Sequence, residues 1–312
     1  MMNSGNNPDV VHTKLDDILY TSFDYDQIPG IAHAENPIIF IQDKTEKQKE
    51  HMEEFSGVGQ WEAHDEEEYR KIATVRTANE KVLTVVNYKK TLKFPDEFME
   101  DEMHKVVNNA VKAVGFRGRT TRDEKALFIY TDGFASTTTA DGVALWSNSH
   151  TSLSGDTIDT LETGALSPAN LEILVRKLME QKSQDNELGG HNPLGLLVPP
   201  ILFPDTNEIT KSEKQANTTD NNLNYFSQIY PGLQIFTNPY IGSTYASAAN
   251  ANTSYYLVSQ NHSITRYVRR GMKTTLVSPD TDDRDRWTYK ASFREVVGPI
   301  SWEGAVASNG TA

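Results

Sequence analysis

The sequence contains no cysteine. This absence excludes disulfide bonds, thiolate metal ligands and cysteine nucleophiles together. The longest apolar runs, at 38–41 and 194–203, are too short and too interrupted by proline to cross a bilayer. Residues 1–12 lack the basic start and the apolar stretch of a secretory signal. We therefore expect no membrane partner and assembly inside the cell.

Basic residues are few relative to acidic ones. Thirty Lys and Arg residues stand against 43 Asp and Glu residues, which gives a formal net charge of −13. Binding to duplex DNA requires clustered lysine and arginine, so sequence-specific DNA binding is not expected. The densest acidic run, WEAHDEEEYRK at 61–71, is typical of a solvated surface. The alternative is a seam that meets a basic patch on a neighbouring chain.

The known motifs of catalysis and ligand binding are also missing. The chain has no GxSxG nucleophile elbow, no HExxH metalloprotease motif and no glycine-rich phosphate loop. Its eight histidines are scattered singly. The acidic string DTDDRD at 280–285 lacks the glycine and glutamate that a calcium-binding EF-hand loop needs. We therefore expect no catalytic residue, no cofactor and no metal site.

One stretch, DGVALWSNSH at 141–150, still holds the residue types of a hydrolase. It places Ser147, Ser149 and His150 within four positions. Neighbouring residues of a strand point to opposite faces, so these three cannot form a catalytic triad alone. A histidine from elsewhere could complete one, because triads are defined by geometry. A serine hydrolase built on Ser147 or Ser149 is therefore the alternative from a different functional class.

Two helices are predicted. The first begins at Pro95 with acidic residues in its first turns, and the segment at 115–125 is expected to interrupt or bend it. The second has Ser167 as its N-cap and Pro168 at its first position. Apolar residues recur at helical spacing in both: Met99, Met103, Val106, Val107, Ala110, Val111 and Val114 in the first, and Leu171, Leu174, Val175, Leu178 and Met179 in the second.

Strands are predicted at 81–94, 194–203, 233–238, 254–259 and 286–306. In the last of these, alternate positions are apolar: Trp287, Tyr289, Ala291 and Phe293. The stretch at 204–224 is polar. Helices and strands come in runs instead of strict alternation, which indicates the α+β class.

The first 94 residues have little apolar material of their own. Residues 1–37 are predicted to form an extended arm that cannot hold its shape alone. Residues 38–94 are charged and elongated, and one face of their last strand carries Val86, Tyr88, Leu92 and Phe94. A two-stranded arm with so small a core is marginal by itself. It therefore needs another surface to lie on.

Five segments, in collinear order, resemble the major capsid proteins of tailed bacteriophages (Caudoviricetes), including the Mu-like head-subunit group. The segment at 126–155, which includes DGVALWSNSH, is similar to a stretch in which an aromatic-rich helix end leads to this turn. The others are VNYKKTLKFPDEFMEDEMHKVV (86–107), LGLLVPPILF (194–203), NNLNYFSQIYPGLQIFTNPYI (221–241) and FREVVGPISWEG (293–304). In the last segment Glu295 stands where the family has an aspartate, and no role is assigned to it.

The resemblance implies the tailed-phage major capsid fold, in which an extended β-hairpin loop and an N-terminal arm reach across neighbouring subunits. The implied boundaries are an N-terminal arm (1–37), an extended loop (38–94), a peripheral domain with a long spine helix (95–165), an axial domain (166–275) and a return to the peripheral domain (276–312). We expect Trp61, Tyr69, Tyr88 and Phe94 to be the contacts of this loop with neighbours.

The resemblance also implies the function. The chain is expected to self-assemble into hexamers and pentamers of an icosahedral head that encloses double-stranded DNA, first in the host bacterial cytoplasm and finally as the virion capsid. Fewer than 40 residues precede the loop, so a separate scaffolding protein is expected, and a chain already trimmed by a protease is the alternative. A portal protein and a possible decoration protein are also expected. An encapsulin-like compartment with a protein cargo is the alternative with the same fold.

Overall fold

The computed structural model describes residues 8–24, 29–55, 57–61, 63–65, 69, 72, 75–100, 104–212, 224–242, 251–279 and 285–311. Its helices are α1 (Pro8–Phe23), α2 (Glu97–Glu100), α3 (His104–Asp132), α4 (Pro168–Met179), α5 (Phe203–Lys211), α6 (Tyr225–Ile229) and the 3-10 helix η1 (Pro239–Ile241). Its strands are β1 (Ile41–Lys44), β2 (Lys49–Phe55), β3 (Thr77–Thr84), β4 (Val86–Pro95), β5 (His150–Thr151), β6 (Thr157–Ile158), β7 (Leu161–Glu162), β8 (Pro193–Val198), β9 (Gln234–Thr237), β10 (Tyr255–Ser259), β11 (Ile264–Val277), β12 (Arg286–Pro299) and β13 (Ala305–Ser308). The α+β class is confirmed.

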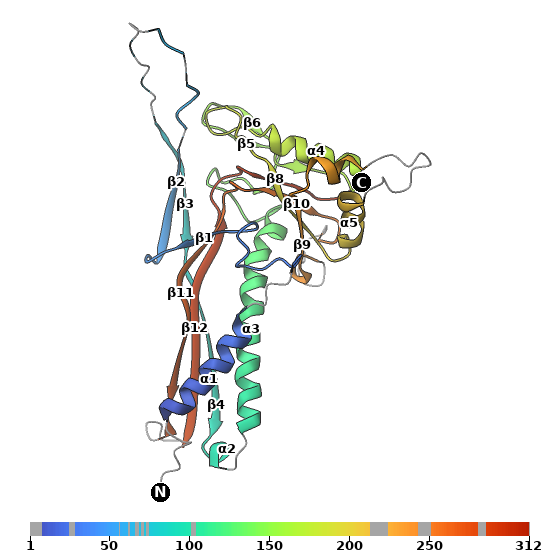
Figure 1. Cartoon of the computed structure of the whole chain (residues 1–312). Helices are drawn as coiled ribbons and strands as arrows, with labels where there is room; N and C mark the ends of the chain where they lie inside the picture. The colour runs from blue at the N-terminus through green and yellow to red at the C-terminus, as the bar shows by residue number, and fades with distance from the viewer. Residues whose placement is uncertain are drawn as a thin grey trace.

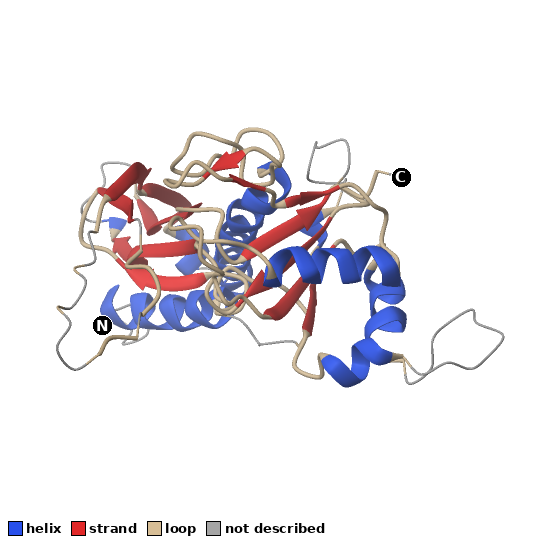
Figure 2. Ribbon diagram, turned by 90° about the horizontal axis from the view of Figure 1, so that it is seen from above, coloured by secondary structure: helices blue, strands red, loops and turns tan. Residues whose placement is uncertain are grey.

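The molecule has three visibly different parts (Figure 1). A long sheet of order β1-β11-β12-β4 runs beside helices α1 and α3. A second sheet, of order β7-β13-β10-β8-β9, lies near the C-terminal end of α3, together with helices α4 and α5. The two-stranded hairpin β2-β3 projects away from both. Seen from above, the strands of the two sheets form separate groups, with helices on the outer side of the second (Figure 2).

The long sheet buries one face against α1 and α3. Alternate residues of β12, from Trp287 to Phe293, are buried on this face, as the sequence pattern predicts. Phe94 of β4 faces Trp287 in the register between these strands. This face packs on Val11, Leu15 and other apolar side chains of the helices in one cluster. The face is therefore covered by the chain's own helices.

The prediction of an extended conformation is wrong for residues 8–23 of the arm, which form α1. Four of its apolar side chains recur every four residues, and these four are buried on α3 and the long sheet: Val11, Leu15, Leu19 and Phe23. One turn of a helix takes 3.6 residues, so this spacing places all four on one face. This helical spacing is present in the sequence, but polar residues surround it and make it hard to recognise.

Of the two outcomes predicted for 115–125, an interruption or a bend, the interruption is wrong, because α3 runs through this segment as one helix. Gly115 and Gly118 serve close helix packing here. A Cβ atom on Gly115 would lie 2.7 Å from the Leu19 carbonyl oxygen, and one on Gly118 would lie 3.2 Å from the Phe23 ring. Each glycine costs a helix about 1 kcal/mol relative to alanine. Contact with α1 offsets that cost.

The second sheet is built around β10, every residue of which is buried. Helix α4 begins as predicted, with the Asn170 backbone N–H donating to Ser167 Oγ at 3.2 Å. It packs on the sheet through most of its predicted stripe, but Met179 at its last position is exposed. Helix α5 lies in the stretch that the sequence indicated only as polar. Its first turn is Pro-initiated and packs Phe203 on the sheet cluster.

The C-terminal segment contributes to both sheets. Strand β12 pairs between β11 and β4 in the long sheet. Only residues 300–304 separate it from β13, which pairs between β7 and β10 in the second sheet. Within the part of the chain that the structure describes, no helix is both long and apolar enough to cross a membrane.

Candidate functional site

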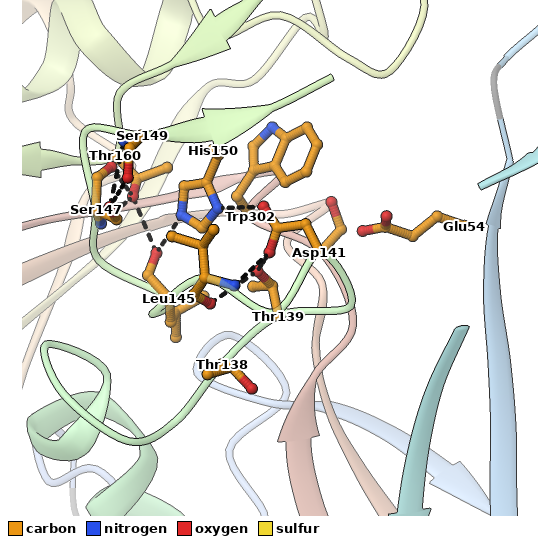
Figure 3. A network of polar contacts seen from close by, with 12 residues as sticks. Glu54, Thr138, Thr139, Asp141, Leu145, Ser147, Ser149, His150, Thr160 and Trp302 are labelled. Atoms are coloured by element: carbon orange, nitrogen blue, oxygen red, sulfur yellow. Dashed lines mark hydrogen bonds and ion pairs between the residues drawn. The ribbon is translucent and has the colours of Figure 1, made fainter. Parts of the chain in front are cut away.

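The stretch 141–150 lies at the junction between the two sheets. His150 is fully buried, and its ring stacks on Trp302 with centroids 5.3 Å apart. Its Nδ1 atom lies 2.8 Å from Asp141 Oδ2, and its Nε2 atom donates toward the Leu145 carbonyl oxygen at 3.2 Å (Figure 3). Both ring nitrogens are therefore engaged in structural contacts.

Asp141 is the centre of this polar network. Besides His150, the Thr139 hydroxyl and the Val143 backbone N–H donate to its carboxylate, the latter at 3.0 Å. Burial by itself would raise the pKa of Asp141, but the hydrogen bonds from His150, Thr139 and Val143 outweigh it and lower that pKa below its ordinary value. The network thus holds a charged carboxylate in the turn at 139–142, which the Gly142 N–H closes by donating to the Thr139 carbonyl oxygen.

The two serines of this stretch form a local turn. Ser147 Oγ and Ser149 Oγ are 2.9 Å apart, and the Ser149 backbone N–H donates to Ser147 Oγ at 3.2 Å. A catalytic base must reach the proton of its nucleophile. His150, with both nitrogens bound elsewhere, does not pair with either serine. Ser147 Oγ thus accepts a hydrogen bond from a nearby backbone group, and a Ser–His pair is not formed here.

The apolar residues of the same stretch attach it to the spine helix α3. Trp146 and Leu145 are buried, and Trp146 Nε1 donates to the Tyr130 carbonyl oxygen at 2.8 Å. Gly133 leaves room for this indole, because a Cβ atom there would lie 2.4 Å from Trp146 Nε1. The stretch therefore joins the end of α3 to the C-terminal segment, which contributes Trp302.

The root of the hairpin, by which we mean its paired strands β2 and β3, is fixed beside this network. Glu54 on β2 is only 5% exposed, and Gln184 Nε2 donates to its Oε2 at 3.1 Å. Burial, and next the nearby Asp141 charge, raise the pKa of Glu54 to about 7, although hydrogen bonds from Ser301 and Asn79 oppose the shift. Figure 3 shows Glu54 reaching from the hairpin toward Asp141.

The other strand of the hairpin is fixed by a lysine. Lys81 Nζ on β3 donates to the Thr138 carbonyl oxygen at 2.8 Å and to Thr138 Oγ1 at 3.0 Å. Burial lowers the pKa of Lys81 despite the opposing effect of Asp141. Further out, the Gly59 backbone N–H donates to Asp185 Oδ2 at 3.1 Å. The hairpin is thus anchored at its root on both strands.

Beyond its root the hairpin exposes large apolar side chains. Trp61 is 100% exposed, Tyr69 is 98% exposed and Ile72 is 92% exposed. Phe55, Val58 and Val75 are also exposed. Apolar surface gains roughly 25 cal/mol for each Å² removed from water, and clustered exposed apolar residues mark interaction sites. This part of the hairpin is therefore the strongest candidate for an interaction surface.

The four predicted contact residues lie in different environments. Trp61 and Tyr69 are on the exposed part of the hairpin. Tyr88 stacks on Phe293 of β12, with ring centroids 4.9 Å apart. One face of the Tyr88 ring is therefore covered by the chain's own sheet. Phe94 is 5% exposed and packs in the cluster beneath α1 and α3. Because the Phe94 side chain packs in the core of its own chain, we do not propose it as a contact with a neighbour.

Several buried or half-buried charged residues have contacts that the sequence did not predict. Glu54 and Lys81 are two of them. A third is Glu295, to which Arg266 Nε donates at 3.0 Å between β12 and β11. Burial raises the pKa of Glu295, and the Arg266 and Arg122 charges act in the opposite direction. No local pattern identifies such residues, because their partners come from distant parts of the chain.

The described residues contain no group of three or more His, Asp or Glu side chains placed to hold a metal ion. The polar residues around Asp141 and His150 are instead hydrogen-bonded to their neighbours at the junction. The arrangement can fix the direction of the hairpin relative to the two sheets.

Solved shell proteins share this fold. The chain is similar to the capsid of Ralstonia phage GP4, with 10% identity, coverage of 92% of this chain and 93% of that chain, and a TM-score of 0.59. It is similar to a virus-like particle from Pyrococcus furiosus, with 11% identity, coverage of 95% and 98%, and a TM-score of 0.55. It is also similar to the capsid of cyanophage Pam1, with 14% identity, coverage of 92% and 96%, and a TM-score of 0.53. No curated protein matches the chain significantly.

These likenesses define the class: the chain has the fold of proteins that build closed shells. The model of the phage capsid protein family matches residues 79–308, and the chain belongs to that family. It is a structural capsid protein, and its place is the virion capsid. The predicted tailed-phage capsid fold is confirmed. Membership of the Mu-like group stays a prediction.

Proposed function

We propose that this chain is the subunit that assembles into hexamers and pentamers of an icosahedral head around double-stranded DNA. The observation that supports this proposal is the projecting hairpin, whose root is fixed by Glu54 and Lys81 while Trp61 and Tyr69 are exposed. A rigidly directed arm with an apolar end suits a contact with a neighbouring subunit. Repetition of one such contact around an axis closes a ring.

The proposed domains follow the two sheets. The long sheet with α3 forms the peripheral domain, and the second sheet with α4 and α5 forms the axial domain. Two of the sequence-based boundaries shift in this proposal. Strand β11 (Ile264–Val277) belongs with the peripheral domain, because it pairs with β12. Strand β13 (Ala305–Ser308) belongs with the axial domain, because it pairs with β10.

Several further roles belong to the proposal. The subunit acts without enzymatic activity, assembles in the host bacterial cytoplasm, and works with a scaffolding protein, a portal protein and a decoration protein. It encloses DNA without recognising its sequence. The net charge of −13 supports this last point, because it limits attraction to phosphate.

The direct test is to express the chain and examine it by negative-stain microscopy and analytical ultracentrifugation. We expect hexamers, sheets of hexamers or closed shells. A chain that stays monomeric at high concentration, both alone and together with the product of the scaffolding gene, would contradict the proposal.

A second candidate shares the fold. The likeness to a virus-like particle from Pyrococcus furiosus keeps an encapsulin-like compartment in consideration. The match to the phage capsid protein family favours the phage head. Extraction of particles from the native source distinguishes the two, since a phage head yields genomic DNA and a compartment yields a protein cargo.

A further inference from the structure

Two neighbouring elements carry basic residues and no acidic ones. Residues 104–122, the first two thirds of α3, contain no aspartate or glutamate but five basic residues: Lys105, Lys112, Arg117, Arg119 and Arg122. Strand β4 also has no acidic residue and carries three lysines: Lys89, Lys90 and Lys93. In the whole chain 43 acidic residues stand against 30 basic ones. This region is therefore a local exception to the negative charge of the molecule.

The fold brings the two elements together at a hollow. Strand β4 is the outermost strand of the long sheet and runs beside α3 (Figure 1). The hollow between them has a volume of about 180 Å³, and Lys89, Lys90, Arg117 and Thr121 are among its lining residues. Lys90 and Arg117 are both exposed. Basic residues that lie 27 positions apart in the sequence thus line one opening.

The exposed side of α3 extends this basic surface along the helix. Lys105, Lys112 and Arg119 recur every seven residues, which is about two helical turns, so they form one row. The Phe116 ring, which is 44% exposed, lies 5.2 Å from the Arg119 guanidinium and 6.0 Å from that of Arg117. An aromatic face attracts a guanidinium, so Phe116 holds both arginines at the surface. We call these residues the basic strip: Lys90, Lys105, Lys112, Arg117 and Arg119.

The basic strip keeps its positive charge in the folded chain. Within the described ranges, Lys90, Lys112 and Arg117 form no ion pair. Arg119 Nη1 donates to the Asp24 carbonyl oxygen at 3.3 Å, which does not neutralise it. The next acidic residue on the exposed side of α3, Glu124, pairs with Lys125 at 3.1 Å. The strip is therefore available to an anionic partner.

The shape of the strip favours a long polyanion. From Lys105 to Arg119 it spans about 21 Å of helix, at 1.5 Å per residue. This length is more than half of one turn of duplex DNA, which is about 34 Å. Lysine and arginine on a helix that lies along a surface contact phosphates, and phosphate contacts carry no sequence information.

We propose that the basic strip on α3 and β4 binds the phosphate backbone of the duplex DNA that the shell encloses. The inference rests on the proposed function, because the DNA content of the shell is part of that proposal. One copy contacts only a few phosphates, so a single subunit binds weakly, whereas many copies in one shell hold the same DNA together. The net charge of −13 is compatible with this arrangement, since it limits attraction of DNA to the rest of the chain.

The test compares three variants of the full chain. The first removes charge from the strip: Lys90→Gln, Lys112→Gln and Arg117→Gln. The matched control removes the same charge from exposed lysines that alternate with the helix-covered residues of the sheet: Lys93→Gln, Lys273→Gln and Lys290→Gln. The third keeps the charge of the strip: Lys90→Arg, Lys112→Arg and Arg117→Lys.

Binding to a labelled DNA duplex is measured by fluorescence anisotropy over a series of salt concentrations. Circular dichroism and thermal melting check folding, and ultracentrifugation gives the oligomeric state. We expect the charge-removing variant to lose about tenfold or more in affinity, and its slope of log K against log salt to fall by about 2–3. The control and the charge-keeping variant should stay within about twofold of the unchanged chain. Lys112→Gln alone, at an exposed helix position, should lower the slope by about 0.9.

Several results would overturn the inference. They are an equal loss in the control, an equal loss in the charge-keeping variant, and an unchanged chain that does not bind the duplex at low salt. Polyglutamate is added as a competitor at the same charge concentration as the duplex. If it displaces the DNA fully, the strip fits an acidic protein surface and the inference is wrong. A chain that never assembles contradicts the proposed function itself, whereas a charge-removing variant that assembles and keeps its DNA affinity contradicts only this inference.

Discussion

Glu54 is a buried acid whose environment favours its neutral form. Its pKa of about 7 in the folded chain stands against an ordinary value of 4.5. Below pH 4.5 both folded and unfolded chains bind the proton, so the site costs nothing. As the pH rises from 4.5 to about 7, the folded state becomes less stable by an amount on the order of 3 kcal/mol, and a further rise adds little. The hairpin root is therefore held more weakly at higher pH.

We predict that Glu54→Gln removes most of this pH dependence. Between pH 5 and pH 8 the unchanged chain should lose stability, and the variant should lose much less. Urea unfolding of the monomer, together with hydrogen exchange in β2 (Lys49–Phe55), measures both effects. Glu53→Gln, at the exposed neighbouring position, is the matched control. A variant that keeps the full pH dependence would show that Glu54 is not its source.

Trp61 is another single residue with a predicted effect, which is on assembly and not on the stability of the chain. Because its side chain is fully exposed in the single chain, Trp61→Ala should leave the melting temperature of the monomer unchanged. In the assembly it should lower the oligomeric fraction at least fivefold, since a buried aromatic anchor contributes more than ~1 kcal/mol. Ile201→Ala, an exposed apolar residue on a turn away from the hairpin, serves as the control. Equal effects of the two substitutions would refute a specific role for Trp61.

At the scale of helices and strands, the contact between α1 and α3 depends strongly on single residues. Gly115→Ala should destabilise the chain by about 1–3 kcal/mol, because overpacking outweighs the gain in helix propensity. The added Cβ would meet the Leu19 carbonyl, a backbone atom that cannot rotate away. Gly232→Ala is the control, since a Cβ there meets nothing within 4 Å. Thermal unfolding of both variants gives the comparison, and a stabilised Gly115→Ala chain would contradict the packing argument.

The elements also show which features a sequence can predict. The Ser167-Pro168 start of α4 and the alternation in β12 depend on neighbouring residues only, and both were predicted correctly. The continuity of α3 could not be predicted, because Gly115 looks like a helix breaker until α1 is placed against it. The hydrogen-bond partners of Glu54 and Glu295 could not be predicted from the sequence either. Their partners, Gln184 and Arg266, are fixed only by the tertiary fold.

At the scale of the whole molecule, the two sheets should unfold together. They share α3, the network around Asp141, and the short connection from β12 to β13. Hydrogen exchange should therefore give opening free energies for β10 (Tyr255–Ser259) and β12 (Arg286–Pro299) that agree within about 1 kcal/mol. Asp141→Asn, which removes the charge but keeps the shape, should lower both values together. Separate transitions for the two sheets would contradict this coupling.

Strands β12 and β13 also impose an order on folding. Both occupy interior positions of their sheets, yet they follow all the other described strands in the sequence. Until they are in place, β4 is not joined to β11, and β7 is not joined to β10. A chain that has not yet formed β12 and β13 therefore cannot complete either sheet. One short segment of the chain closes both.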